Sequence, residues 1–212
     1  MKRIVVSVIM CLLVSGSVYA AEEMKMEDMK MMEMKMKDMK MQNAFSVIHA
    51  RKSVRHFTGA AVSKADLEKI VRAGMAAPTA GNKQPWSFIL ITERKTLDAL
   101  AAGLLNARML SKAGAAIVVC TEQEKANGKL RDLAITDAAL AGENILLAVE
   151  ALGLGGVWTA ANPYEDRVKV VKTILNIPPE VIPMNVIAIG YPTGEDQPKD
   201  KYKKEKIHWE KW

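Results

Sequence analysis

Two continuous apolar runs limit what this chain can fold into. Residues 86–92 read Trp-Ser-Phe-Ile-Leu-Ile-Thr, and residues 115–121 read Ala-Ala-Ile-Val-Val-Cys-Thr. Each run has the length of a strand and is rich in β-branched or aromatic residues, so both are predicted to be buried strands. Shorter strand patterns follow at 155–159 and 184–190. A sheet therefore has to lie inside the folded domain.

Helical patterns alternate irregularly with these strands. Ser63 is predicted to be an N-cap, because Asp66 stands three residues later and apolar residues then recur at helical spacing. The pattern at 130–152 is apolar on much of its circumference, so we expect this helix to be central or at an interface. Further helical patterns cover residues 45–51, 95–105, 107–113 and 164–175. The order predicts a three-layer α+β or α/β domain and excludes a repeat protein.

The first twenty residues have the pattern of a secretory signal peptide. Lys2 and Arg3 precede an apolar run at 4–14, and small residues occupy positions 18 and 20 of a cleavage-site pattern. Eleven helical residues would span about 16 Å, which is far short of a hydrocarbon core of about 30 Å. We therefore expect a cleaved signal, no stable membrane span, and an exported, periplasmic protein.

A methionine-rich segment follows the predicted signal. Residues 24–41 hold nine of the fourteen methionines, interleaved with Lys, Glu and Asp. Two interpretations stay open: a solvated, partly helical tether, or a segment whose thioethers bind Cu(I) or Ag(I). The predicted organisation is a signal peptide at 1–20, a Met/Lys-rich tether at 21–42 and one domain at 43–212.

Composition excludes several classes of function. Two cysteines cannot form a disulfide scaffold, and Cys11 lies in the predicted signal, which leaves Cys120. The formal net charge of +6 is compatible with an anionic ligand but too small to indicate nucleic-acid binding. The chain has three histidines and no Gly-x-Ser-x-Gly motif, so we assign no catalytic residue and no metal ligand.

Three polar segments are candidates for a binding site. Arg51, Ser53 and Arg55 alternate, so an extended chain would direct them to one side and form a phosphate clamp; a solvated basic turn is the alternative. Residues 76–86 combine small residues with Asn and Gln, which suits a planar ligand but also an ordinary loop. Residues 198–202 offer a second phosphate contact or a frayed basic tail.

Four segments in this order resemble the nitroreductase family of FMN-dependent flavoproteins, from about residue 44 to the C-terminus. They are Arg-Lys-Ser-x-Arg-x-Phe at 51–57, Ala-Pro-Thr-x-x-Asn-x-Gln-Pro-Trp at 77–86, Gly-Gly-Val-Trp-Thr at 155–159, and Gly-Tyr-Pro at 190–192 with Pro-Lys-x-Lys at 198–201.

The resemblance implies cofactor-binding residues. The FMN phosphate would be held by Arg51, Lys52, Ser53, Arg55, Lys199 and Lys201. The flavin ring and ribityl chain would be contacted by Pro78, Thr79, Ala80 and Asn82, commonly from the partner subunit, and by Asn106, Trp158, Thr159 and Ala160. The turn at 163–165 would offer a backbone N–H near flavin N5.

The resemblance also implies a fold and an activity. The fold would be a three-layer α/β/α arrangement with a mixed central sheet, in an intertwined homodimer with FMN at the interface. The protein would reduce nitroaromatics, quinones or related electrophiles, with NAD(P)H or another reductant as donor. The alternatives are an exported metal-handling protein with a flavin-binding scaffold, and an inactive flavin-binding dimer in a redox assembly.

Overall fold

The computed structural model describes residue 31 and residues 44–212. The chain divides into two units, 1–46 and 47–212, and the description below concerns the second. The predicted signal peptide and all but Met31 of the predicted tether lie outside the described residues. Within the described part, no helix is long and apolar enough to cross a bilayer.

Four strands form one sheet in the order β1-β2-β4-β3. They span Trp86–Ile91 (β1), Ala115–Glu122 (β2), Gly155–Ala160 (β3) and Val181–Gly190 (β4). All three strand pairings are antiparallel, so the named strands do not form the mixed sheet that we expected. Among the described residues, parallel pairing is limited to the isolated bridge between Ser53 and Gly156.

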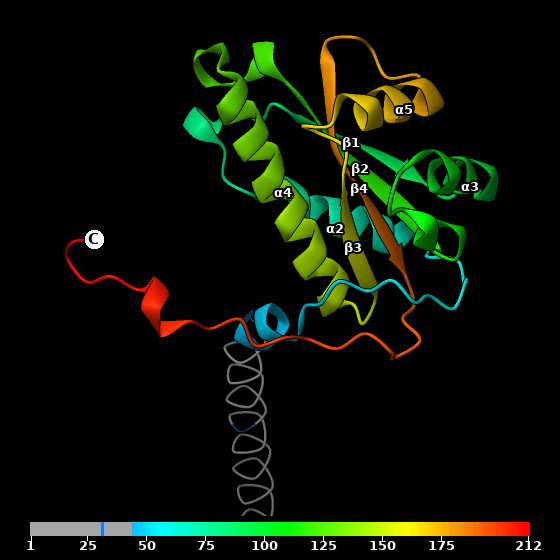
Figure 1. Cartoon of the computed structure of the whole chain (residues 1–212), viewed down its shortest axis with the longest axis horizontal. Coiled ribbons are helices and arrows are strands. Elements are labelled where there is room, and N and C mark those ends of the chain that lie inside the picture. Colours follow the sequence, from blue (N-terminus) through cyan, green and yellow to red (C-terminus); the bar gives the residue numbers. More distant parts are fainter. Residues whose placement is uncertain (1–30, 32–43) are drawn as a thin grey trace, which may run out of the picture. The chain divides into compact units, whose positions relative to one another are not determined.

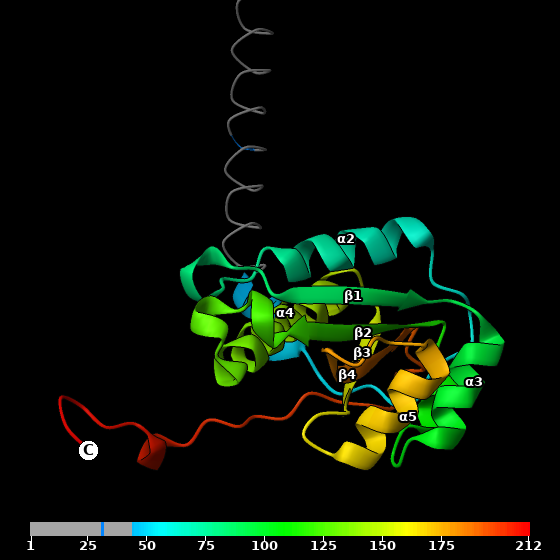
Figure 2. The same ribbon diagram turned by 90° about the horizontal axis from the view of Figure 1, so that it is seen from above.

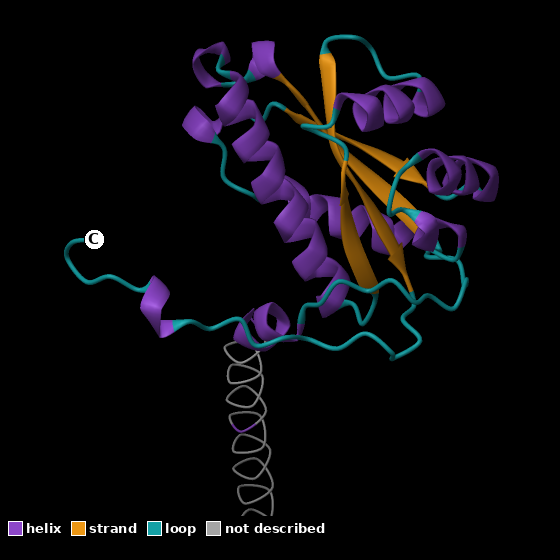
Figure 3. Ribbon diagram, viewed as in Figure 1, coloured by secondary structure: helices purple, strands orange, loops and turns teal. Residues whose placement is uncertain are grey.

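Helices cover both faces of this sheet, which confirms the three-layer prediction (Figures 2 and 3). Lys64–Met75 (α2) and Arg131–Ala151 (α4) pack on one face, and Arg94–Gly103 (α3) and Glu165–Leu175 (α5) pack on the other. Alternate residues of the central strand β2 face the two cores: Ile117 belongs to the α2/α4 core and Val118 to the α3/α5 core. The unbroken apolar run at 115–121 thus has a physical cause, because β2 is buried on both faces.

The predicted helix cap at Ser63 is confirmed. Its Oγ accepts a hydrogen bond from the Asp66 backbone N–H at 3.0 Å and donates one to the Asp66 carboxylate at 2.8 Å. These bonds satisfy one of the free N–H groups at the start of α2 and fix where the helix begins. The buried face of α2 then packs along α4 (Figure 1).

Two elements differ in extent from the sequence prediction. Strand β4 starts at Val181 rather than at 184, and it passes through Pro183 because the ladder shifts there, from Val119–Asn185 to Cys120–Pro183. The helical stretch predicted at 107–113 is a short 3₁₀ turn, Arg108–Ser111. It follows Asn106, whose φ of 64° ends any continuous helix from α3.

Candidate functional site

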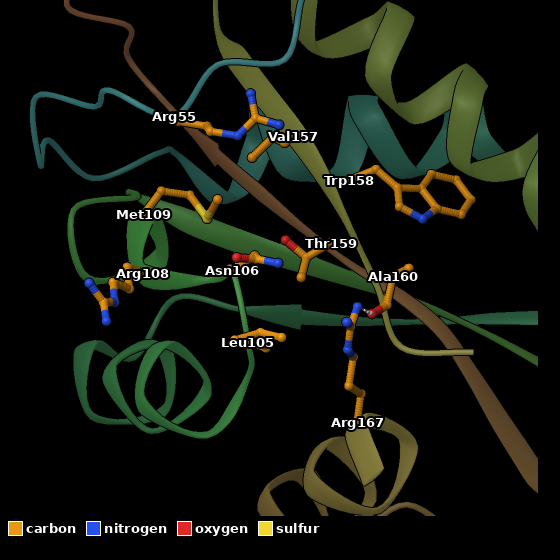
Figure 4. Close-up of a pocket in the computed structure, with 10 residues that line it drawn as sticks. All are labelled: Arg55, Leu105, Asn106, Arg108, Met109, Val157, Trp158, Thr159, Ala160 and Arg167. Carbon is orange, nitrogen blue, oxygen red and sulfur yellow. Dashed lines mark hydrogen bonds between the residues drawn. The ribbon is translucent and has the colours of Figure 1, made fainter. Parts of the chain in front are cut away.

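A pocket of about 980 Å³ lies on the α3/α5 side of the sheet (Figure 4). Its walls come from β3, from the connection after α3, from α5 and from the extended segment before α2. We call it the large pocket; it is lined by Arg55, Leu105, Asn106, Arg108, Met109, Val157, Trp158, Thr159, Ala160 and Arg167. The structure therefore brings together Asn106, Trp158, Thr159 and Ala160, the implied flavin contacts, and adds Arg55, which the resemblance implies for the phosphate.

Side chains alternate along β3, so neighbouring residues of this strand face opposite sides of the sheet. Figure 4 shows the Thr159 side chain facing Asn106 across the large pocket, while the indole of Trp158 points away, toward α4. The indole lies against Gly142 of α4, where a Cβ atom would collide with it. Trp158 consequently borders the pocket near its backbone, whereas Thr159 borders it with its side chain.

Three arginines give the large pocket a cationic wall. Nη1 of Arg167 donates a hydrogen bond to the Ala160 carbonyl at 3.3 Å, and the guanidinium stacks 3.9 Å above the ring of Tyr164. Within residues 44–212, no carboxylate forms an ion pair with Arg55, Arg108 or Arg167. The pocket is thus prepared for an anionic or electron-rich ligand.

Arg108 and Arg167 are absent from the sequence prediction. Arg167 stands two residues after the turn at 163–165, and Arg108 two residues after Asn106. Their closeness in the chain to predicted contacts is the signal that could have identified both.

A second pocket, of about 510 Å³, lies beside the C-terminal segment. We call it the tail pocket; it is lined by Ile48, His49, Arg51, Pro198, Lys199, Asp200, Lys201 and Tyr202. Nε of Arg51 lies 3.4 Å from a carboxylate oxygen of Glu143, which keeps part of this guanidinium engaged. The structure brings Arg51, Lys199 and Lys201 together, as predicted, but places Arg55 in the large pocket.

Lys52 and Ser53, which the resemblance implies as phosphate contacts, line neither pocket. The Lys52 ammonium lies 3.1 Å and 3.3 Å from the two carboxylate oxygens of Glu150 on α4. Ser53 is exposed and forms the parallel bridge with Gly156. Arg51 and Lys52 therefore both reach carboxylates of α4, Glu143 and Glu150.

Asp196 fixes the backbone that carries Arg55. Its Oδ2 accepts hydrogen bonds from the N–H groups of Arg55 at 2.8 Å and His56 at 3.1 Å, and Nδ1 of His56 lies 3.1 Å away. Partial burial raises the pKa of this carboxyl, but these hydrogen bonds and the imidazole outweigh that effect and hold the pKa below its ordinary value. No motif marked this residue in the sequence, because its partners are 141 and 140 positions away.

The loop that contains Pro78, Thr79, Ala80 and Asn82 lines neither pocket. It is held by Asp137 of α4, a buried carboxylate whose Oδ1 accepts the Ala80 N–H at 3.0 Å. Thr79 Oγ1 accepts the Gln84 N–H at 3.1 Å, and Asn82 has a φ of 53°. The loop is therefore well anchored, but within one chain it is not brought to the large pocket.

The turn predicted to offer a backbone N–H, at 163–165, lies at the start of α5. Its Tyr164 supports Arg167 of the large pocket, while Pro163 and Glu165 line a different hollow. The turn thus separates two pockets.

Comparison with known proteins agrees with this arrangement. The model of the Nitroreductase family matches residues 48–191. An Archaeoglobus fulgidus protein, provisionally named an NADH dehydrogenase/NAD(P)H nitroreductase, is 38% identical over 174 residues, which cover 81% of this chain and 99% of that one.

Two solved structures have the same fold. A crystal structure from Parabacteroides distasonis, with the same provisional name, has 43% sequence identity and a TM-score of 0.75, covering 81% of this chain and 99% of its own. A provisionally named nitroreductase from Desulfovibrio desulfuricans, crystallised in complex with FMN, has 27% identity and a TM-score of 0.69, covering 79% and 96%.

Proposed function

The chain belongs to the nitroreductase family of oxidoreductases, and on that premise we propose that it transfers hydride through bound FMN to nitroaromatic, quinone or related electrophilic small molecules. FMN is the cofactor, in keeping with the FMN complex of the Desulfovibrio desulfuricans relative. When bound, FMN supplies an N5 position that accepts a hydride and returns its electrons to a second substrate.

The residues present fit this cofactor. Asn106 and Thr159 offer polar groups to a planar ligand in the large pocket, beside three arginines without carboxylate partners among the described residues. Arg51, Lys199 and Lys201 of the tail pocket would hold the phosphate. A cationic group such as Arg55 beside the ring would stabilise reduced, anionic flavin.

One observation carries the proposal: the extended segment 51–55 has Arg51 in one pocket and Arg55 in the other. A single short segment thereby joins a cationic phosphate site to a ring-sized pocket. Asp196 holds the Arg55 end of this segment through two backbone hydrogen bonds. A ligand with a phosphate at one end and a planar ring at the other suits both sites at once.

The electron donor that we propose is NADH or NADPH, as the name of the Archaeoglobus fulgidus relative suggests for that protein. Exported protein would meet little of either nucleotide, so another reductant has to serve if the N-terminal segment directs export. The acceptor would enter through the open side of the large pocket.

We further propose an intertwined homodimer. Within one chain the loop at 78–82 stays away from the large pocket, so the flavin contacts implied for it require a second copy. The tail beyond β4 extends away from the sheet (Figure 1), and its Trp209 and Trp212 are 84% and 101% exposed. Aromatic side chains of this size are usually covered, and a partner chain would cover them.

Export to the periplasm stays a proposal that rests on the sequence of residues 1–20. The mass of the mature protein purified from cell fractions tests it. A protein that keeps residues 1–20 in the cytoplasmic fraction would contradict export without affecting the flavin chemistry.

The activity is tested with FMN-saturated protein under anaerobic conditions. NADH and NADPH are added in turn while the visible flavin absorption is followed, and a nitroaromatic or a quinone is then added. Bleaching by one donor and recovery with an acceptor support the proposal. Two results would contradict it. The protein takes up no FMN, or its bound flavin, reduced by either nucleotide or by dithionite, does not pass electrons to an acceptor.

A further inference from the structure

A third pocket, of about 490 Å³, lies on the other side of the turn at 163–165 from the large pocket. We call it the side pocket. It is formed by the start of α4, the connection from β3 to α5, one face of α5 and the start of β4. None of its residues lines the large pocket or the tail pocket, so it is a separate site.

The side pocket carries an excess of positive charge. Arg131, Lys169 and Lys172 line it, against the single carboxylate of Glu165. In the described part of the chain none of the three cations forms an ion pair, and Glu165 is not paired with Lys169 although it stands four residues earlier on the same helix. Three cations with one carboxylate among them still repel one another, and a bound anion would relieve that repulsion.

Two of these cations are held in place. Nη2 of Arg131 donates a hydrogen bond to Oδ1 of Asn162 at 2.9 Å, and the Lys172 ammonium donates one to the Pro179 carbonyl at 2.6 Å. Each keeps further N–H donors, since a guanidinium has five and an ammonium three. Lys169 stands three residues before Lys172 on α5, so both ammonium groups project from the same face. The donors are therefore oriented before a ligand arrives.

The side pocket is also larger than an inorganic ion needs. Its volume falls in the range of about 300–1,000 Å³ that is typical of small-molecule sites, and Val168 and Ile182 add apolar wall. Three cations against one carboxylate match a dianion better than a monoanion. We propose that the side pocket binds a small organic phosphomonoester, whose phosphate is held by Arg131, Lys169 and Lys172 and whose organic part lies on the apolar wall.

The proposal is tested by isothermal titration calorimetry of FMN-saturated full-length protein with phenyl phosphate, and with inorganic phosphate for comparison. Saturation with FMN occupies the other phosphate site. We expect phenyl phosphate to bind more tightly than inorganic phosphate, and Lys169→Gln and Arg131→Gln each to weaken it about tenfold, the size of one lost charge-assisted hydrogen bond. Lys95→Gln, which removes one exposed charge on α3 outside all three pockets, is the matched control.

Three results would overturn the proposal. Phenyl phosphate binding that is unchanged in Lys169→Gln would exclude the side pocket. Equal weakening in Lys95→Gln would show that only overall charge matters. Loss of binding in Arg51→Ala, with Lys169→Gln unaffected, would place the probe in the tail pocket instead. The proposed oxidoreductase activity does not depend on any of these results.

Discussion

Oδ2 of Asp196 lies 2.8 Å from the backbone nitrogen of Arg55, although 141 positions separate the two residues in the chain. The same oxygen accepts the N–H of His56. This carboxylate therefore ties the C-terminal segment, which leads to Lys199 of the tail pocket, to the segment that carries Arg55 into the large pocket. The two proposed halves of the FMN site depend on one another through Asp196.

Replacement of Asp196 by Ala should weaken FMN binding about tenfold, because two backbone N–H groups lose a charged acceptor and Arg55 loses its fixed position. Titration of apoprotein with FMN, followed by flavin fluorescence, measures the effect. Glu195→Ala removes the exposed neighbouring charge and serves as control. The double variant Asp196→Ala/Arg55→Ala should lose less FMN affinity than the sum of the two single losses; full additivity would mean that Asp196 acts independently of Arg55.

The stability of the protein should also depend on Asp196 in acid. The pKa of this carboxyl is held below its ordinary value of 3.8, so its contribution is complete above that value and is lost as the pH falls through the lower, folded-state pKa. Urea unfolding at neutral pH and at about pH 3 should therefore show a stability difference between wild type and Asp196→Asn that shrinks in acid. A difference that is constant or grows on acidification would contradict this assignment.

Arg51 lines the tail pocket and Arg55 lines the large pocket, so binding of FMN and of riboflavin should respond differently to the loss of each arginine. Arg51→Ala should weaken FMN about tenfold or more and leave riboflavin unaffected, since riboflavin lacks the phosphate. Arg55→Ala should weaken both flavins, because Arg55 lines the large pocket. Lys52→Ala is the control: its loss should lower stability through Glu150 and leave both affinities unchanged. Selective loss of FMN binding in Lys52→Ala would return Lys52 to the phosphate site.

Much of the fold follows from local patterns in the sequence. The run at 115–121 predicts β2, and Ser63 with Asp66 predicts the start of α2, because strand burial and helix capping depend on residues close in the chain. The end of α3 was harder to predict, because the composition of this stretch does not require the positive φ that Asn106 adopts. The start of β4 was missed because Pro183 is tolerated only through a register shift against β2.

The sequence predicted which residue types form the candidate site, but not how these residues are distributed between two pockets. Alternation grouped Arg51 with Arg55, but the two side chains line different pockets, and Arg51 pairs with α4 as Lys52 does. The resemblance implied Lys52 as a phosphate contact, and its partner Glu150, 98 positions away, could not be foreseen from the sequence. Asp196 and Asp137 were missed for the same reason, because their hydrogen-bond partners come from distant segments.

The indole of Trp158 leaves no room for a side chain at position 142, so we expect glycine to be required there. Alanine in the middle of α4 would gain about 1 kcal/mol in helix propensity, but its Cβ would collide with Trp158. Overpacking of this kind costs about 1–3 kcal/mol, so we expect Gly142→Ala to lower the unfolding free energy. Trp158→Leu in the Gly142→Ala background should restore part of the loss in a double-mutant cycle of urea unfolding. A Gly142→Ala protein more stable than wild type would contradict the contact.

Cys120 should be chemically silent in the folded protein and should make the protein sensitive to alkali. It is fully buried in β2, and burial raises the pKa of its thiol to about 12 from an ordinary 9.0. The thiol is neutral when folded but ionises when unfolded, so its contribution to stability is complete below pH 9.0 and is lost as the pH rises toward about 12. Wild type should therefore lose more unfolding free energy between about pH 8 and pH 11 than Cys120→Ala does.

A chromogenic disulfide reagent applied to protein without residues 1–20 should label one thiol in urea and none in buffer; rapid labelling in buffer would show that the α3/α5 core opens there.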